Sequence, residues 1–403
     1  MSEHRPEVAD VFREHGAAYV AGNGIAADQQ RVLRNLVRCR TAALGGHLNR
    51  CDHCDHEEIS YNSCGNRHCP KCQGRAQAKW HIDREADLLE VPYFHVVFTL
   101  PAEIGPLVLQ NRRLMYGLLL RAVSQTLMTI ARDPKHLGAE IGCLAVLHTW
   151  GQNLHYHPHV HCVIPGGGLS LDKQRWVQSR PRFFLSVAVL RKFFRGCFLN
   201  HLQKAAQQQK IQFHGKQAAL AEPEQWQCLL DTLKAKQWVV YAKPPFGGPR
   251  QVLKYLARYT HRVAISNQRI LSIEGSQVKF RWKDYRHGNQ QRVMTLTSEE
   301  FIRRFLQHVL PKGFQRIRHY GFLANRFKAE KLDLCRRLMT ECAHQSEVVG
   351  KNQEQGSSTF QATQILCSVC RQGWMQRVME IAPSGARSPP NTSTSKNSQG
   401  RAA

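Results

Sequence analysis

A histidine pair near the middle of the chain is the first set of residues whose spacing suits chemistry. His159 and His161 flank the apolar Val160, and apolar residues continue to Ile164. On a β-strand, residues two apart point to the same face, so the two imidazoles would converge on one point. Neutral imidazole is the commonest metal-ligating side chain. The pair therefore predicts a metal site on a strand; the alternative is a histidine-rich loop beside a core strand.

A tyrosine pair further along the chain is the second such set. Tyr255 and Tyr259 lie four residues apart among apolar residues at helical spacing. They would share one helix face, about 6 Å apart along the axis. Arg258 and Arg262 form a second pair on an adjacent face. A phenol has a pKa of about 10 and needs help to act as a nucleophile. A phosphate held by a divalent metal and arginines would supply that help; the alternative is an aromatic stripe packed into the core.

Together these motifs resemble the HUH endonucleases, and specifically the two-tyrosine transposases of rolling-circle insertion sequences. His159-Val160-His161 is similar to the histidine–hydrophobic–histidine motif, and Tyr255 with Tyr259 is similar to the tyrosine pair. The segments 147–152 and 311–321 also resemble this family. The resemblance extends from about residue 10 to about residue 328.

This resemblance implies an enzyme that cleaves and rejoins single-stranded DNA. One tyrosine attacks the scissile phosphorus, a 3′-hydroxyl leaves, and a 5′-phosphotyrosine linkage conserves the bond energy without ATP. The two tyrosines would handle two strand ends in turn. Mg²⁺ or Mn²⁺ would be held by His159, His161 and a third ligand, which in HUH proteins often comes from the neighbouring strand. We expect His148 to be that ligand, with Gln152 and His157 as alternatives; His148 as a core histidine is the non-functional alternative.

Cysteines cluster towards the N-terminus. The pairs Cys51-x-x-Cys54 and Cys69-x-x-Cys72 are separated by fourteen residues. This spacing predicts a zinc ribbon, in which four thiolates surround Zn²⁺. In the resembling family the segment is a zinc-binding DNA-recognition module. Residues nearby that could replace one of these ligands or build a second site are Cys39, His47, His53, His56, Cys64 and His68.

A further cysteine pair, Cys367 and Cys370, lies close to the C-terminus and lacks two ligands for a metal site. The residues that could complete it nearby in sequence are Cys335, Cys342 and His344.

The charge of the chain points to a polyanionic partner. Lys and Arg number 56 against 30 Asp and Glu, which gives a formal net charge of +26. Such a field attracts nucleic acid, although a ribosomal or membrane-surface protein could share it. Between residues 311 and 326, basic residues alternate with aromatics, a pattern that suits a groove following single-stranded DNA. The predicted DNA contacts are Arg258, Arg262, Lys312, Arg316 and Arg318.

These properties also predict partners and location. The expected partner is single-stranded DNA at the element ends and the target site, and host replication proteins are further candidates. The sequence contains no run of about 18 consecutive apolar residues, so no membrane partner is expected. Clustered cysteines favour metal binding in a reducing cytosol. We therefore expect a bacterial cytoplasmic protein associated with the nucleoid.

The periodicity of apolar residues and the resemblance to the two-tyrosine transposases together imply an α+β fold in three parts. Residues 1–92 would form a helical and zinc-binding module. Residues 93–328 would form the catalytic domain, with the histidines on a central strand of an antiparallel sheet, flanking helices, and the tyrosines on a helix packed across the sheet. Residues 329–403 would form an extension with a linker and a basic disordered tail. Strands are expected at 93–99, 143–149, 158–164 and 238–243, and helices at 107–130 and 183–209.

Two other functions fit parts of this pattern. A plasmid or phage replication initiator or relaxase would use the same nicking site and would recognise a replication origin. A non-catalytic zinc-dependent DNA-binding protein would bind DNA without using Tyr255 or Tyr259. The cysteine-rich segment and the similarity at 311–321 favour the transposase.

Overall fold

The chain forms two compact units. The computed structural model describes residues 5–182, 184–243, 251, 263–285, 287–344 and 365–384. Unit 1 comprises residues 1–33 and 66–353, and unit 2 comprises residues 34–65 and 354–403. Helices and antiparallel sheets together confirm the α+β class. The boundaries at residues 92 and 328 stay a prediction, and residues 1–92 are divided between the two units.

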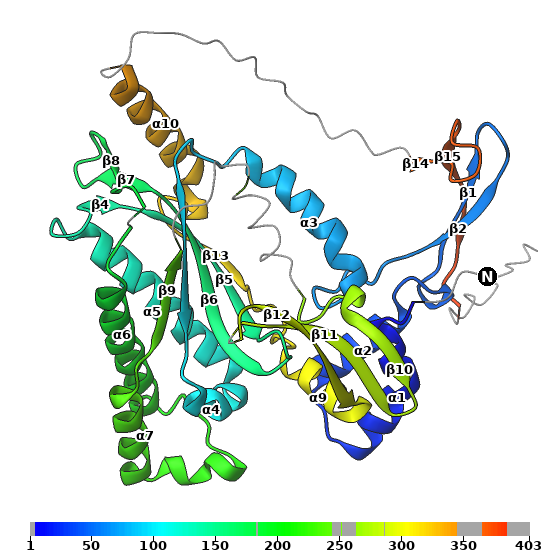
Figure 1. Cartoon of the computed structure of the whole chain (residues 1–403), viewed down its shortest axis with the longest axis horizontal. Helices are drawn as coiled ribbons and strands as arrows, with labels where there is room; N and C mark the ends of the chain where they lie inside the picture. Colours follow the sequence, from blue (N-terminus) through cyan, green and yellow to red (C-terminus); the bar gives the residue numbers. More distant parts are fainter. Residues whose placement is uncertain are drawn as a thin grey trace, which may run out of the picture. The chain divides into compact units, whose positions relative to one another are not determined.

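A central antiparallel sheet organises unit 1. Among its described residues, five strands pair in the order β13, β5, β6, β3 and β9 (Figure 1). Their bounds are β3 (Tyr93–Thr99), β5 (Gly142–Trp150), β6 (Tyr156–Pro165), β9 (Val239–Lys243) and β13 (Ile317–Gly321). The strand with the histidine pair, β6, is therefore the middle one, as expected. Sequence patterns predict four of these strands, but they do not predict β13.

Helices cover one face of this sheet (Figure 1). They are α4 (Gly105–Gln110), α5 (Arg112–Arg132), α6 (Val187–Gln207) and α7 (Pro223–Ala235). Sheet residues such as Phe98, Leu147 and Val160 pack against Leu119 of α5 and Phe194 of α6. By length and composition α5 would suffice to cross a membrane. Its packing in this cluster is that of the core helix of a folded domain.

At one end of the opposite face, a second core cluster covers the sheet. There, Leu144, Val146 and Val163 pack with Leu332 and Cys335 of α10 (Lys328–His344). A small described sheet adjoins this end, with strands in the order β4 (Ala139–Glu140), β7 (Gly167–Ser170) and β8 (Trp176–Gln178). The histidine end of β6 lies outside this cluster.

A second layer of unit 1 combines N-terminal and later segments. Its described elements are α1 (Val8–Gly22), the part of α2 (Ala27–Arg38) that precedes residue 34, α3 (Pro70–Glu85), the meander β10 (Ile270–Glu274), β11 (Gln277–Asp284) and β12 (Gln290–Thr297), and α9 (Ser298–Gln307). The rings of Phe12 and Phe305 lie 5.1 Å apart, which joins α1 to α9. The Thr297 hydroxyl accepts a hydrogen bond from the backbone N–H of Glu300, 3.2 Å away, and caps α9.

The described part of the chain also contains short 3-10 helices. They are η1 (Ala42–Leu44), η2 (Ala102–Ile104), η3 (Gly215–Ala221), η4 (Asn267–Arg269) and η5 (Asn325–Phe327).

Unit 2 contains one sheet among its described residues. Its strands are ordered β14 (Ile365–Leu366), β15 (Trp374–Ile381), β1 (Gly46–Cys51) and β2 (Glu57–Tyr61), and every pairing is antiparallel. The C-terminal strand β15 thus lies next to the N-terminal strand β1 (Figure 1).

Replacement of Leu119 by Ala tests the main core of unit 1. Leu119 is fully buried, so the change should cost about 2–5 kcal/mol of unfolding free energy through lost burial and the cavity left behind. Leu171→Ala is the matched control, because that side chain is 53% exposed. Urea denaturation of both variants measures the difference; equal stabilities would contradict the assigned core.

Candidate metal centres

Three histidines converge on one face of the central sheet. In the part of the chain that the structure describes, His148, His159 and His161 form a group whose ligand nitrogens lie within 4.8 Å of one another. Strand pairing explains the group, because His148 on β5 lies directly opposite His159 on β6. His161 follows two residues later on the same face. The structure thus brings the expected third residue to the histidine pair.

The rings of the β6 histidines are oriented by hydrogen bonds at Nδ1. His159 Nδ1 lies 2.6 Å from the carbonyl oxygen of His157, to which it donates. His161 Nδ1 lies 2.8 Å from Nε2 of His95 on β3. Metal-binding imidazoles commonly use one nitrogen for the ion and donate the other N–H to a nearby acceptor. Both rings can therefore offer Nε2 to an ion.

Burial shapes the rest of the site. His148 and His161 are buried and His159 is partly exposed, so the group is accessible from the His159 side. The ring of His148 stacks on Trp150, with centroids 4.7 Å apart. A neutral imidazole costs less free energy to bury than a charged one, and it is also the form that binds a metal.

His95 is a site residue that the sequence interpretation misses. Burial, reinforced by the Lys243 ammonium, lowers the pKa of His95 to about 3. The ring is therefore neutral at pH 7, and its Nε2 can accept the proton of His161 Nδ1. The sequence signal for His95 is weak. Along Tyr93–Thr99 the core residues Val96 and Phe98 lie on one side of the strand, and His95 lies on the other, less apolar side.

The two alternatives for the third position, His157 and Gln152, are not part of the described histidine group, although the His157 ring lies 5.1 Å from that of His159. His157 is exposed and is not part of the described group; it contributes its carbonyl oxygen to His159. The Gln152 side chain donates to the hydroxyl of Tyr285, 3.3 Å away.

The predicted nucleophiles lie outside the described residues. Tyr255 and Tyr259, together with the neighbouring Arg258 and Arg262, belong to the segment 252–262. Their roles stay predictions.

The other predicted DNA contacts differ in exposure. Lys312 is exposed and Arg318 is partly buried, with its guanidinium 5.5 Å from the centre of the Phe314 ring. Arg316 is only 6% exposed and its Nη2 lies 3.4 Å from Oε1 of Gln73. Burial, with the nearby Arg67 charge, lowers the pKa of Arg316 to about 10. Its backbone carbonyl accepts from Leu147 N–H, next to His148. Arg316 is therefore buried in this structure, and its predicted DNA contact stays a prediction.

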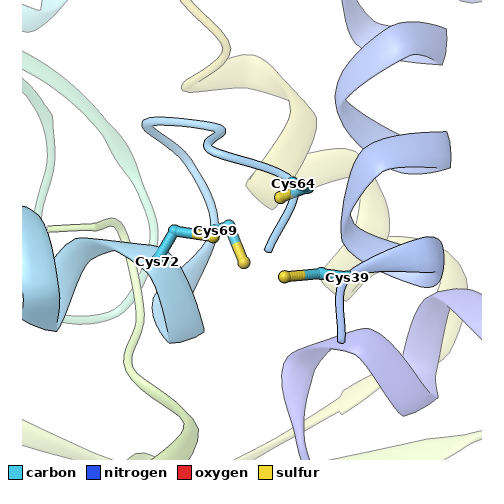
Figure 2. Close-up of side chains that lie close together, drawn as sticks. All are labelled: Cys39, Cys64, Cys69 and Cys72. Carbon is cyan, nitrogen blue, oxygen red and sulfur yellow. The ribbon is translucent and has the colours of Figure 1, made fainter. Parts of the chain in front are cut away.

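The cysteines predicted to share one zinc ion fall into two groups. Cys69 and Cys72 cluster with Cys39 and Cys64, and the four sulfur atoms lie within 4.8 Å of one another (Figure 2). Cys39 follows α2, and Cys72 lies in the first turn of α3. The nearby candidate His68 is not in the group; its Nε2 accepts from the backbone N–H of Leu310.

Cys51 and Cys54 cluster instead with the C-terminal pair Cys367 and Cys370. Cys335, suggested by sequence proximity as a partner for that pair, is buried among apolar residues of the second core cluster. Each described cysteine group offers four sulfur donors, which suit Zn²⁺, whereas the histidine group offers three nitrogens and leaves room for other ligands.

The described residues thus contain a histidine group on an antiparallel sheet and separate cysteine groups, which are two kinds of candidate metal site. Comparisons with known proteins define the class of the protein. Residues 142–331 match the Y2 transposase family model, described as "Putative transposase", and residues 11–100 match one described as "Transposase zinc-binding domain". The chain is 57% identical over 340 residues to "Putative transposase y4qJ" of Sinorhizobium fredii, covering 84% of this chain and 85% of that one. The chain belongs to this transposase family.

Two further similarities were found. The transposase for insertion sequence element IS801 of Pseudomonas savastanoi pv. phaseolicola is 29% identical over 306 residues, covering 75% of this chain and 72% of the relative. Among solved structures, the conjugative relaxase TrwC in complex with oriT DNA aligns at 14% identity, covering 64% of this chain and 96% of that one. Its TM-score of 0.21 is too low to carry an argument.

The identity of the third ligand can be tested with His148→Phe and His157→Phe. Phenylalanine keeps an aromatic ring beside Trp150 but removes the nitrogen donors, so His148→Phe should weaken Mn²⁺ binding by more than about 100-fold. His157→Phe keeps the carbonyl that orients His159 and should leave the affinity unchanged. Isothermal titration measures both; the reverse order would assign the third position to His157.

The role of His95 is tested by His95→Phe. Loss of the acceptor removes a hydrogen bond that orients the His161 ring, so Mn²⁺ affinity should fall by about 10–100-fold. His201→Phe is the control, because His201 bonds Gln125 on the helical layer. An unchanged dissociation constant for His95→Phe would refute the orienting contact.

Proposed function

We propose that this transposase nicks and rejoins single-stranded DNA through a 5′-phosphotyrosine intermediate and thereby drives rolling-circle transposition of an insertion sequence. Membership of the transposase family supports the overall activity. The observation that carries the mechanism is the convergence of His148, His159 and His161 on one face of the central sheet, with ring orientations set by hydrogen bonds.

The histidine group has the donors for a divalent cation. Mg²⁺ or Mn²⁺ held there would polarise the scissile phosphate and offset the charge that develops on its oxygens. The protein's contribution is to bring three imidazoles together and to orient the rings of His159 and His161 through hydrogen bonds at Nδ1. The partly exposed His159 side gives a phosphodiester access to the group.

Tyr255 and Tyr259 are the proposed nucleophiles. A tyrosine oxygen attacks phosphorus and loses its proton, the bond to the 3′ oxygen breaks, and that oxygen leaves as a 3′-hydroxyl. The new 5′-phosphotyrosine bond is reversed when a 3′-hydroxyl attacks it. With two tyrosines, one can retain the first 5′ end while the other cleaves a second strand. Arg258 and Arg262 would neutralise phosphate oxygens beside them.

Single-stranded DNA at the element ends and target site is the proposed substrate. The net charge of +26 supports a polyanionic partner. Lys312 and Arg318 provide exposed or partly exposed cations beside Phe314, an arrangement that suits backbone contacts along a single strand.

We assign Zn²⁺ to Cys39, Cys64, Cys69 and Cys72, within the segment that matches the transposase zinc-binding domain. A bacterial cytoplasmic, nucleoid-associated location and contacts with host replication proteins accompany this proposal.

The decisive test is formation of a covalent protein–DNA adduct. The protein is incubated with Mg²⁺ and with 5′- and 3′-labelled single strands from the ends of its own element, and denaturing gels are read for adduct. Wild type should retain label from the 3′-labelled strand, because the tyrosine keeps the 5′ end of that fragment. Tyr255→Phe and Tyr259→Phe should each retain adduct, and the double variant should form none.

Controls separate the alternatives. Tyr241→Phe removes an exposed tyrosine of β9 and should leave the adduct unchanged. If one single tyrosine variant abolishes all adduct, the chain has one nucleophile and works as a replication initiator does. If the protein binds DNA but forms no adduct with any divalent metal, the enzymatic proposal is contradicted, and the chain is a zinc-dependent DNA-binding protein.

A further inference from the structure

The loops that carry Cys51 and Cys54 and those that carry Cys367 and Cys370 lie at the same end of the unit 2 sheet. Cys51 ends β1 and Cys54 lies in the turn before β2. Cys367 and Cys370 lie in the loop that joins β14 to β15. Since β1 pairs with β15, with Cys51 opposite Met375, the two hairpins present their cysteine loops side by side (Figure 1).

The spacing of the sulfur atoms fits a tetrahedral metal site. Cys51 Sγ lies 3.7 Å from Cys370 Sγ, and Cys54 Sγ lies 3.7 Å from Cys367 Sγ. Four sulfurs placed tetrahedrally at about 2.3 Å from Zn²⁺ would be separated by about 3.8 Å. A disulfide requires about 2.05 Å between sulfurs, so these cysteines are not bonded to each other.

Backbone geometry supports thiolates at this position. His53 N–H lies 3.4 Å from Cys51 Sγ, and Gly373 N–H lies 3.4 Å from Cys370 Sγ. Each hairpin thus directs a backbone N–H at one of its own sulfurs, and such donors favour the charged thiolate. Gly373 also allows the loops to approach closely, because a Cβ added there would lie 2.6 Å from Cys51 Sγ and 2.5 Å from His53 Cβ.

Among the described residues, this sheet buries few apolar side chains. In β2 every residue except Tyr61 is exposed, and in β15 the apolar side chains of Val378 and Met379 are 50% and 55% exposed. The most buried side chains at the paired loops are Cys51 and Cys367, each 1% exposed. A small module with so little apolar burial commonly takes its folding free energy from a structural metal.

We propose that Cys51, Cys54, Cys367 and Cys370 form a structural Zn²⁺ site that joins the C-terminal hairpin to the N-terminal hairpin as one zinc ribbon. Cys367 and Cys370 lie beyond both segments that match the transposase family models. The site binds zinc rather than a hard cation because all four donors are sulfur. Residues 365–381 are therefore required to complete the ligand set of Cys51 and Cys54. This inference does not depend on the proposed cleavage mechanism.

Zinc content of the full-length protein tests the proposal. Purified wild type and the double variant Cys367→Ser/Cys370→Ser are compared by inductively coupled plasma mass spectrometry. The double variant should lose about one zinc ion per chain. Cys228→Ser is the matched control, because Cys228 is exposed and lies in neither described cysteine group. Unchanged zinc content in the double variant would overturn the proposal, and so would iron in place of zinc in the wild type.

A measurement on the wild type alone covers the case in which the variant fails to fold. Thiols are alkylated before and after zinc removal by a chelator, and the modified peptides are quantified by mass spectrometry. Cys54, exposed at the surface, should be protected together with Cys367 and Cys370 until the chelator is added, whereas Cys228 should react in both samples. Full alkylation of Cys367 and Cys370 before chelation would refute the site.

Discussion

The alternation of side chains along β6 is the constraint on which the histidine group depends. Val160 and Cys162 are fully buried against the helical layer, so His159 and His161 must project from the opposite face. A register slip of one residue would place both imidazoles in the apolar core. The antiparallel pairing with β5 then brings His148 opposite His159. Burial of apolar residues on one face thus determines the positions of the nitrogen donors on the other.

Burial also determines the protonation state of His95, the residue that orients His161. His95 is buried in surroundings with little water, where a charged imidazolium is costly. The low pKa of His95 leaves it neutral and able to accept from His161. Since a metal ligand must also be neutral, desolvation and ligation favour the same form of the ring. The cost of burying these histidines is reduced by the hydrogen bonds and ring contacts among them.

Local patterns made the central strands and the histidine pair predictable, because alternation and spacing are properties of a few consecutive residues. Long-range pairing was not predictable in this way. Cys51 and Cys69 belong to similar motifs close in sequence, yet the pairing of β1 with β15 gives Cys51 a partner near the C-terminus. Arg316 sits in a basic and aromatic stretch typical of DNA contacts, but packing beside Gln73 buries it. His95 became recognisable only through its neighbour His161.

The charges of the described ligand groups distinguish their roles. Three neutral imidazoles leave a bound divalent cation with its full charge, so the occupied histidine group would attract a phosphodiester. Four thiolates around Zn²⁺ give a net charge of about −2, which repels phosphate. Neither cysteine group would therefore be suited to hold a DNA phosphate directly, and a metal bound there would serve the fold. DNA contact by the zinc-binding segment would have to come from its cationic side chains, such as Arg50 and Lys71. In the described structure both already pair with carboxylates, Glu57 and Glu7. Phosphate binding there would have to compete with these ion pairs, whereas at the histidine group the cation itself supplies the attraction.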